Sequence, residues 1–167
     1  MAGADTPGSG TAGEAAGYLA QAVALAVRSV GSAGGPFGAL VVAPDGRVFE
    51  GTNRVTATND PTAHAEVVAI RRACSELGSF ELSGCVLYSS CEPCPLCLSA
   101  ALWARLDRVY YAADRHDAAR AGFDDAAFHD YIRGGGNASL LPVEQVEVPG
   151  SGEPFRSWAA LATRTEY

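Results

Sequence analysis

Two short motifs that lie far apart in the chain must meet around one metal ion, and this requirement limits the possible folds most. His64-Ala-Glu66 offers an imidazole and a carboxylate, and the segment Pro-Cys-Pro-Leu-Cys at 93–97 offers two thiols. One His and two Cys suit a catalytic zinc ion, which takes three protein ligands and keeps its fourth position for water. We therefore expect His64, Cys94 and Cys97 to bind one Zn²⁺, with Glu66 as the general base.

The cysteines also allow other interpretations. Two cysteines in the first turn of a helix can be no more than small buried residues. Cys91 stands three residues before Cys94, so Cys91, Cys94, Cys97 and His64 could form a closed structural zinc site. A closed site leaves Glu66 no zinc-bound water to act on, whereas an open site lowers the pKa of that water toward about 7. Two further cysteines, Cys74 and Cys85, are expected to pack in the core.

Length and composition favour one soluble domain. The chain has 167 residues, which suits a single hydrophobic core. We expect residues 1–13 to form a disordered tail and residues 14–167 to form the domain. The start of the chain lacks the features of a signal peptide, and no segment approaches the roughly 20 apolar residues that span a bilayer. The five cysteines are an odd number and favour thiols or metal ligands, so we predict a cytoplasmic protein without membrane association.

The charged residues narrow the chemistry. All twelve basic residues are arginines, which excludes a Schiff-base lysine, pyridoxal phosphate chemistry and a P-loop. The net charge is −7, and the arginines are scattered rather than gathered in a stripe. A nucleic-acid partner such as tRNA or DNA is therefore disfavoured. A small uncharged substrate suits this composition better.

Hydrophobic periodicity and turn residues predict helices that alternate with strands after an initial hairpin. Pro61 and Thr62 open the helix that carries the first motif, with Thr62 as its N-cap. Both ligand pairs then lie at helix starts. The pattern predicts an α/β three-layer α/β/α sandwich with a mixed five-stranded sheet. The predicted helices are 14–30, 62–78, 94–105, 124–133 and 155–163, and the predicted strands are 39–43, 47–51, 85–90, 108–113 and 143–148.

With both motifs in place, the chain resembles the cytidine deaminase superfamily, whose signature joins His-x-Glu to Pro-Cys-x-x-Cys. The likeness covers nearly everything after the expected tail and is specifically to the guanine deaminase branch. Ala-Gly-Phe-Asp-Asp125 and the terminal Tyr167 are the features that point to guanine. The similar segments are 59–66, 90–97, 103–105, 111–114, 121–125 and 165–167.

The resemblance implies roles for individual residues. Glu66 would move a proton from the zinc-bound water to the ring, and Asp125 would hold or protonate the leaving amino group. Asn53 would bond the polar edge of the base. Further contacts to the base would come from Phe37, Ala65, Trp103 and Tyr167. Known dimers of this branch exchange their C-terminal segments, so the resemblance implies a homodimer in which residues 153–167 cross to the partner.

Several of these residues have a simpler interpretation when the resemblance is set aside. Asp125 is then an ordinary helix cap, and Phe37 and Trp103 are core aromatics. His116 and His129 are expected at the surface. The alternative functions are deamination of another amino-heterocycle, such as guanosine, cytosine, an aminotriazine or tRNA adenosine, and a non-catalytic, zinc-stabilised interaction domain.

Overall fold

The computed structural model describes residues 12–32, 34–123, 125–134 and 140–167. Most of the expected N-terminal tail therefore lies outside the described residues. The strands are β1 (Gly38–Val42), β2 (Val48–Thr52), β3 (Val86–Cys91) and β4 (Arg108–Ala113). The helices are α1 (Ala12–Val30), α2 (Val55–Thr58), α3 (Ala65–Leu77), α4 (Pro95–Trp103), α5 (Arg115–Arg120), α6 (Ala126–Arg133) and α7 (Glu153–Ala160).

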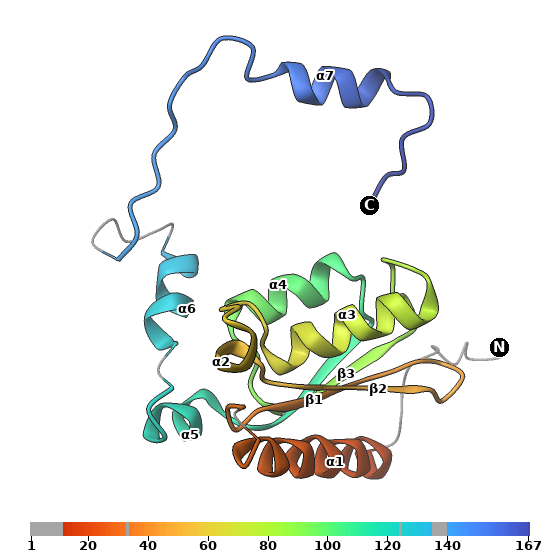
Figure 1. The fold of residues 1–167 in the computed structure, drawn as a ribbon, viewed down its shortest axis with the longest axis vertical. Coiled ribbons are helices and arrows are strands. Elements are labelled where there is room, and N and C mark those ends of the chain that lie inside the picture. Colours follow the sequence, from red (N-terminus) through yellow and green to blue (C-terminus); the bar gives the residue numbers. More distant parts are fainter. Residues whose placement is uncertain (1–11, 33, 124, 135–139) are drawn as a thin grey trace, which may run out of the picture.

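The four strands form one mixed sheet in the order β2-β1-β3-β4. The central strand β1 pairs antiparallel with both β2 and β3, and β3 pairs parallel with β4. Helix α1 covers one face, while α3 and α4 lie on the other (Figure 1). The sequence therefore predicted the three-layer α/β/α arrangement and the mixed sheet correctly.

The predicted fifth strand is wrong for this chain. Residues 143–148 have no regular secondary structure in the described chain, and Val143 and Val146 are 77% and 76% exposed. The segment follows α6 and leads away from the sheet toward α7 (Figure 1). Three β-branched valines within six residues favour extended backbone, but a strand also needs a neighbour to bond with. No described strand pairs with this segment, so the sheet has four strands.

A close approach of α3 to the sheet positions the first motif. A Cβ atom at Gly51 of β2 would lie 2.2 Å from the carbonyl oxygen of Ala65 and 2.5 Å from the backbone nitrogen of Ala69. Only glycine leaves room for the helix backbone at this distance from the strand. The start of α3 is thereby held against the sheet next to the ends of β1 and β3.

Two local predictions also need correction. His64, rather than Thr62, occupies the N-cap position of α3. Thr62 instead bonds Asp60, whose Oδ1 accepts from both the backbone nitrogen and the hydroxyl of Thr62. Helix α5 was not predicted, although Asp114 and Asp117 form a capping box at its start.

Among the described residues, no helix combines the length and the hydropathy needed to span a bilayer.

Candidate active site

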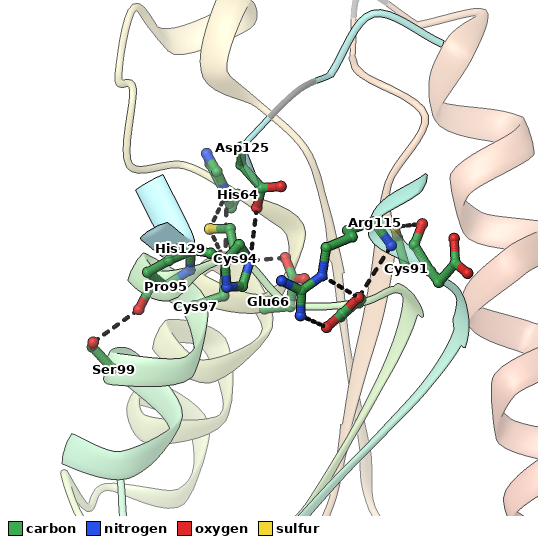
Figure 2. A network of polar contacts seen from close by, with 12 residues as sticks. His64, Glu66, Cys91, Cys94, Pro95, Cys97, Ser99, Arg115, Asp125 and His129 are labelled. Carbon is green, nitrogen blue, oxygen red and sulfur yellow. Dashed lines mark hydrogen bonds and ion pairs between the residues drawn. The ribbon is translucent and has the colours of Figure 1, made fainter. Parts of the chain in front are cut away.

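The two motifs meet at the first residues of α3 and α4. His64 is the N-cap of α3, and Cys94 is the N-cap of α4, with Pro95 directly after it. Neither side chain makes a capping hydrogen bond, so both remain directed at a shared space (Figure 2). Cys97 lies one turn further into α4 and is fully buried. Two helix N-termini, each carrying partial positive charge, therefore face the thiols and favour their thiolate forms.

The three side chains have the geometry of a zinc site. Nδ1 of His64 lies 3.5 Å from the Sγ atoms of both Cys94 and Cys97, and the two Sγ atoms are 3.6 Å apart. Zinc bonds of about 2.3 Å to sulfur and 2.0 Å to nitrogen, at tetrahedral angles, separate such ligand atoms by about 3.5–3.8 Å. Among the His, Cys, Asp and Glu side chains of the described residues, these three form the only cluster that is arranged to hold a metal ion.

The two thiols are hydrogen-bonded to each other, and their pKa values are shifted in opposite directions. The pKa of Cys94 is lowered to about 4, mainly by the hydrogen bond between its side chain and that of Cys97. The same hydrogen bond raises the pKa of Cys97, and burial raises it further. Cys94 is thus the first thiolate. Zinc binds thiolates, so metal binding must release the proton of the Cys97 thiol. A low pH must therefore weaken metal binding.

Cys91 is outside the metal cluster. It is the last residue of β3, and its thiol donates to the carbonyl oxygen of Asp114 at 3.5 Å. Burial raises the pKa of this thiol to about 11, which keeps it protonated. The closed site of four protein ligands is therefore not formed. A zinc ion held by these three residues would keep its fourth position for water, as the first interpretation requires.

Zinc content should distinguish these cysteines. We expect Cys94→Ser to weaken zinc binding more than tenfold, since even the loss of residues that only orient ligands costs about 10–100-fold. Cys91→Ser should keep about one zinc per chain, because its Sγ bonds only a backbone carbonyl. Metal analysis after dialysis against a chelator checks both variants. If the Cys91→Ser protein lost its zinc while it stayed folded, the result would support the interpretation of a closed site with four protein ligands.

Glu66 is a buried carboxyl beside the metal cluster. It is only 5% exposed, and its Oε1 accepts a hydrogen bond from the Ser89 hydroxyl at 2.9 Å. Its Oε2 lies 3.4 Å from Sγ of Cys97. Burial is the main cause that raises the pKa of Glu66. A raised pKa makes this carboxyl a stronger base than a free one, which suits a group that must accept a proton and release it again in acid-base catalysis.

A cavity of about 410 Å³ opens onto this cluster. Its lining includes His64 and Glu66 together with three residues expected to meet the substrate or the leaving group, namely Asn53, Phe37 and Asp125. The volume is within the range of small-molecule sites. Oδ1 of Asn53 accepts from the backbone nitrogen of Val55 at 3.2 Å, which orients the amide. The structure therefore brings these predicted residues together.

Three predicted base contacts do not line this cavity. Ala65 is fully buried at the start of α3. Trp103 and Tyr167 line a separate groove near Phe80, with ring centroids 5.9 Å apart. Trp103 is 62% exposed, so its interpretation as a core aromatic is wrong. Neither Trp103 nor Tyr167 lines the cavity formed by its own chain.

Sequence reasoning missed an ion pair in the cavity wall. Glu92 and Arg115 both line the cavity, and the guanidinium bonds both carboxylate oxygens through Nε and Nη2. Arg115 is the main cause that lowers the pKa of Glu92. The pair ties the loop before Cys94 to the start of α5. The signal for it was positional, since Glu92 and Arg115 follow the carboxyl ends of the parallel strands β3 and β4.

Two more residues of this region were missed. The Phe123 ring packs edge-on against Phe37 with centroids 4.9 Å apart, and it forms part of the cavity wall. His129 was expected at the surface, but it is only 6% exposed. Its Nε2 lies 3.3 Å from Oδ2 of Asp125. On α6 the burial comes from packing against α4, which the sequence of α6 alone does not show.

Comparisons with known proteins agree with this geometry. The family model described as "Cytidine and deoxycytidylate deaminase zinc-binding region" matches residues 14–113. The chain is 48% identical to guanine deaminase from Bacillus subtilis over 90% of this chain and 97% of that protein. A crystal structure of guanine deaminase from Bacillus subtilis covers 91% of this chain and 98% of the solved chain, with a TM-score of 0.84 and 47% identity.

A second relative matches a shorter region. The tRNA-specific adenosine deaminase of Agrobacterium fabrum is 48% identical over 79 residues, which are 47% of this chain and 51% of that protein. The residues matched by the family model include His64, Cys94 and Cys97. On its motifs, its site geometry and these matches, the chain belongs to the zinc-binding cytidine and deoxycytidylate deaminase family.

Proposed function

We propose that the protein is a zinc-dependent guanine deaminase, which converts guanine and water into xanthine and ammonia. The cavity is the observation that carries the proposal, because its lining combines two of the zinc ligands, His64 and Cys94, and buried Glu66 with Asn53 and Asp125. Cys97, the third ligand, is buried beside them. The similarity to the Bacillus subtilis guanine deaminase supports the choice of substrate, since it extends over almost the full length of both chains.

The reaction replaces the amino group on C2 of guanine with the oxygen of water. A C2–O bond forms and the C2–N bond breaks. One proton of the water ends on ring nitrogen N3, and the other leaves with the amino group as ammonia. Zinc held by His64, Cys94 and Cys97 would polarise that water and lower its pKa toward about 7.

The residues of the chain then move and hold protons. The Glu66 carboxylate accepts a proton from water and delivers it to the ring, and the Ser89 hydroxyl holds the carboxylate in place. Asp125, in the same cavity, holds the leaving amino group. Asn53 bonds the polar edge of the base, while Phe37 and Phe123 form an apolar wall.

A substrate panel scored for released ammonia tests the proposal. We expect guanine to be deaminated about 10³–10⁴-fold faster, in kcat/KM, than cytosine, cytidine or adenine. Discrimination of this size is reached when the wrong substrate leaves buried polar groups of the site without partners. Guanosine, an aminotriazine and tRNA belong in the same panel. Faster turnover of any of these would overturn guanine as the substrate, and the absence of ammonia from all of them would favour a non-catalytic zinc domain.

We also propose that two chains exchange their C-terminal segments, so that Tyr167 of each chain closes the partner's cavity. Support comes from α7 and its flanks, where Phe155 is 77% exposed and Tyr167 is 72% exposed. Helix α7 also lies apart from the sheet and its covering helices (Figure 1). Such exposed apolar side chains are typical of a surface that binds another protein chain. A cytoplasmic location stays a prediction, supported by five cysteines that are all free thiols.

A further inference from the structure

A buried histidine with no assigned part in the reaction lies behind Asp125. His129 is four residues after Asp125, so both side chains lie on the same face at the start of α6. The His129 ring is 6% exposed, and its Nε2 lies 3.3 Å from Oδ2 of Asp125 (Figure 2). Nε2 makes no hydrogen bond of regular geometry in the described structure. A buried polar atom left in this state costs stability, which calls for an explanation in terms of function.

Asp125 has an unusual position for a carboxylate. It is the N-cap residue of α6, where an aspartate side chain normally accepts a backbone N–H of the first turn. Here it makes no such capping bond, and it lines the cavity instead, with His64 and Glu66. A carboxylate that does not cap its helix needs another contact to fix its rotamer. The contact that the structure provides is His129.

We propose that His129 is a positioning residue, which donates from Nε2 to Oδ2 of Asp125 and leaves Oδ1 for the amino group of the substrate. This inference rests on the proposed function, in which Asp125 holds the leaving group. The present separation of 3.3 Å closes to a hydrogen bond by a small rotation of either side chain. Catalytic hydrogen bonds are often long before substrate binds and shorten in the complex.

Two substitutions separate a positioning role from simple packing. His129→Phe keeps a buried ring but removes the donor, and His129→Gln places an amide N–H near the position of Nε2. We expect His129→Phe to lower kcat on guanine about 10–100-fold, since a misplacement of about 1 Å costs up to about 10²-fold. KM should change less than about threefold, and His129→Gln should recover kcat to within about fivefold of the wild type.

His116→Phe is the matched control. His116 lies on α5, is exposed, and does not line the cavity. Its substitution should leave kcat unchanged. Zinc content and the melting temperature are measured for every variant, so that a misfolded protein is recognised.

A double-mutant cycle tests whether His129 acts through Asp125. In an Asp125→Ala background, His129→Phe should lower kcat less than about twofold further, because the group that it positions is gone. An equal loss in both backgrounds would overturn the proposal, and so would a His129→Phe enzyme with wild-type kcat. The cycle is run on whichever substrate the panel shows to be deaminated fastest, so a failure of guanine as substrate stays separate from a failure of this inference. Independently of turnover, a zinc-loaded crystal structure of His129→Phe with Asp125 in its wild-type place would contradict it.

Discussion

Glu66→Gln is expected to bind zinc normally and to lose at least about 10³-fold of kcat on guanine. General acid-base residues contribute about 10²–10⁴-fold, and Glu66 is proposed to act on the proton twice, once at the water and once at the ring. Glutamine has nearly the same shape and keeps an oxygen that accepts from the Ser89 hydroxyl. It cannot accept and release a proton near neutral pH.

The same substitution should leave the fold intact. Burial raises the pKa of Glu66, which shows that the charged form is disfavoured inside the protein. A neutral amide removes this cost, so the melting temperature should stay equal or rise. Steady-state ammonia release, metal analysis and thermal unfolding together check the prediction.

Glu76→Gln on the same helix provides the control. Glu76 pairs with Arg72 on the exposed side of α3, and a surface pair of this type contributes only about 0.3–0.5 kcal/mol. Its kcat should match the wild type. If Glu66→Gln retained turnover within tenfold of the wild type, the proton transfer would have to be assigned to another group, with Asp125 as the next candidate in the cavity.

The sequence predicted most of what is local in this structure. The hairpin at β1 and β2 is encoded by two apolar runs around Pro44-Asp45-Gly46, and strand β4 was predicted with its observed bounds. The zinc cluster was predicted because the ligand types and their positions at helix starts are visible in the chain itself. His64, Cys94 and Cys97 could be named as ligands from the two motifs alone, and the only tertiary contact that this prediction assumed is the contact between the motifs.

The failures concern features that depend on neighbours distant in the sequence. Residues 143–148 contain three β-branched valines, which favour a strand, but no described strand pairs with them. His129 is the one buried residue of α6, a helix that packs beside α4, and the sequence of α6 alone does not show this contact. Trp103 was assigned to the core from its residue type, yet it lies in an exposed groove with Tyr167. In each case the residue type gave a reasonable default that the tertiary arrangement overrides.

Removal of residues 165–167 is expected to abolish guanine turnover while zinc content and dimerisation persist. In its own chain Tyr167 lies near Trp103 and Phe80, outside the cavity that holds Glu66. If Tyr167 closes a cavity, that cavity belongs to a second chain. The apolar residues of α7, such as Phe155 and Trp158, remain in the truncated chain to hold the segment on its partner.

Subunit mixing tests this exchange directly, because two inactive chains should complement each other. A Glu66→Gln chain supplies an intact Tyr167, and the truncated chain supplies an intact Glu66. Random mixing at equal amounts makes about half of the dimers mixed, and each mixed dimer has one competent site of two, so about one quarter of the wild-type activity should return. Without exchange, each chain closes its own cavity, every site carries one of the two defects, and verified mixing restores nothing. Tyr167→Phe in place of the truncation then separates the contribution of the ring from that of the hydroxyl, since phenylalanine keeps the apolar surface that covers the base and removes only the hydrogen-bonding group.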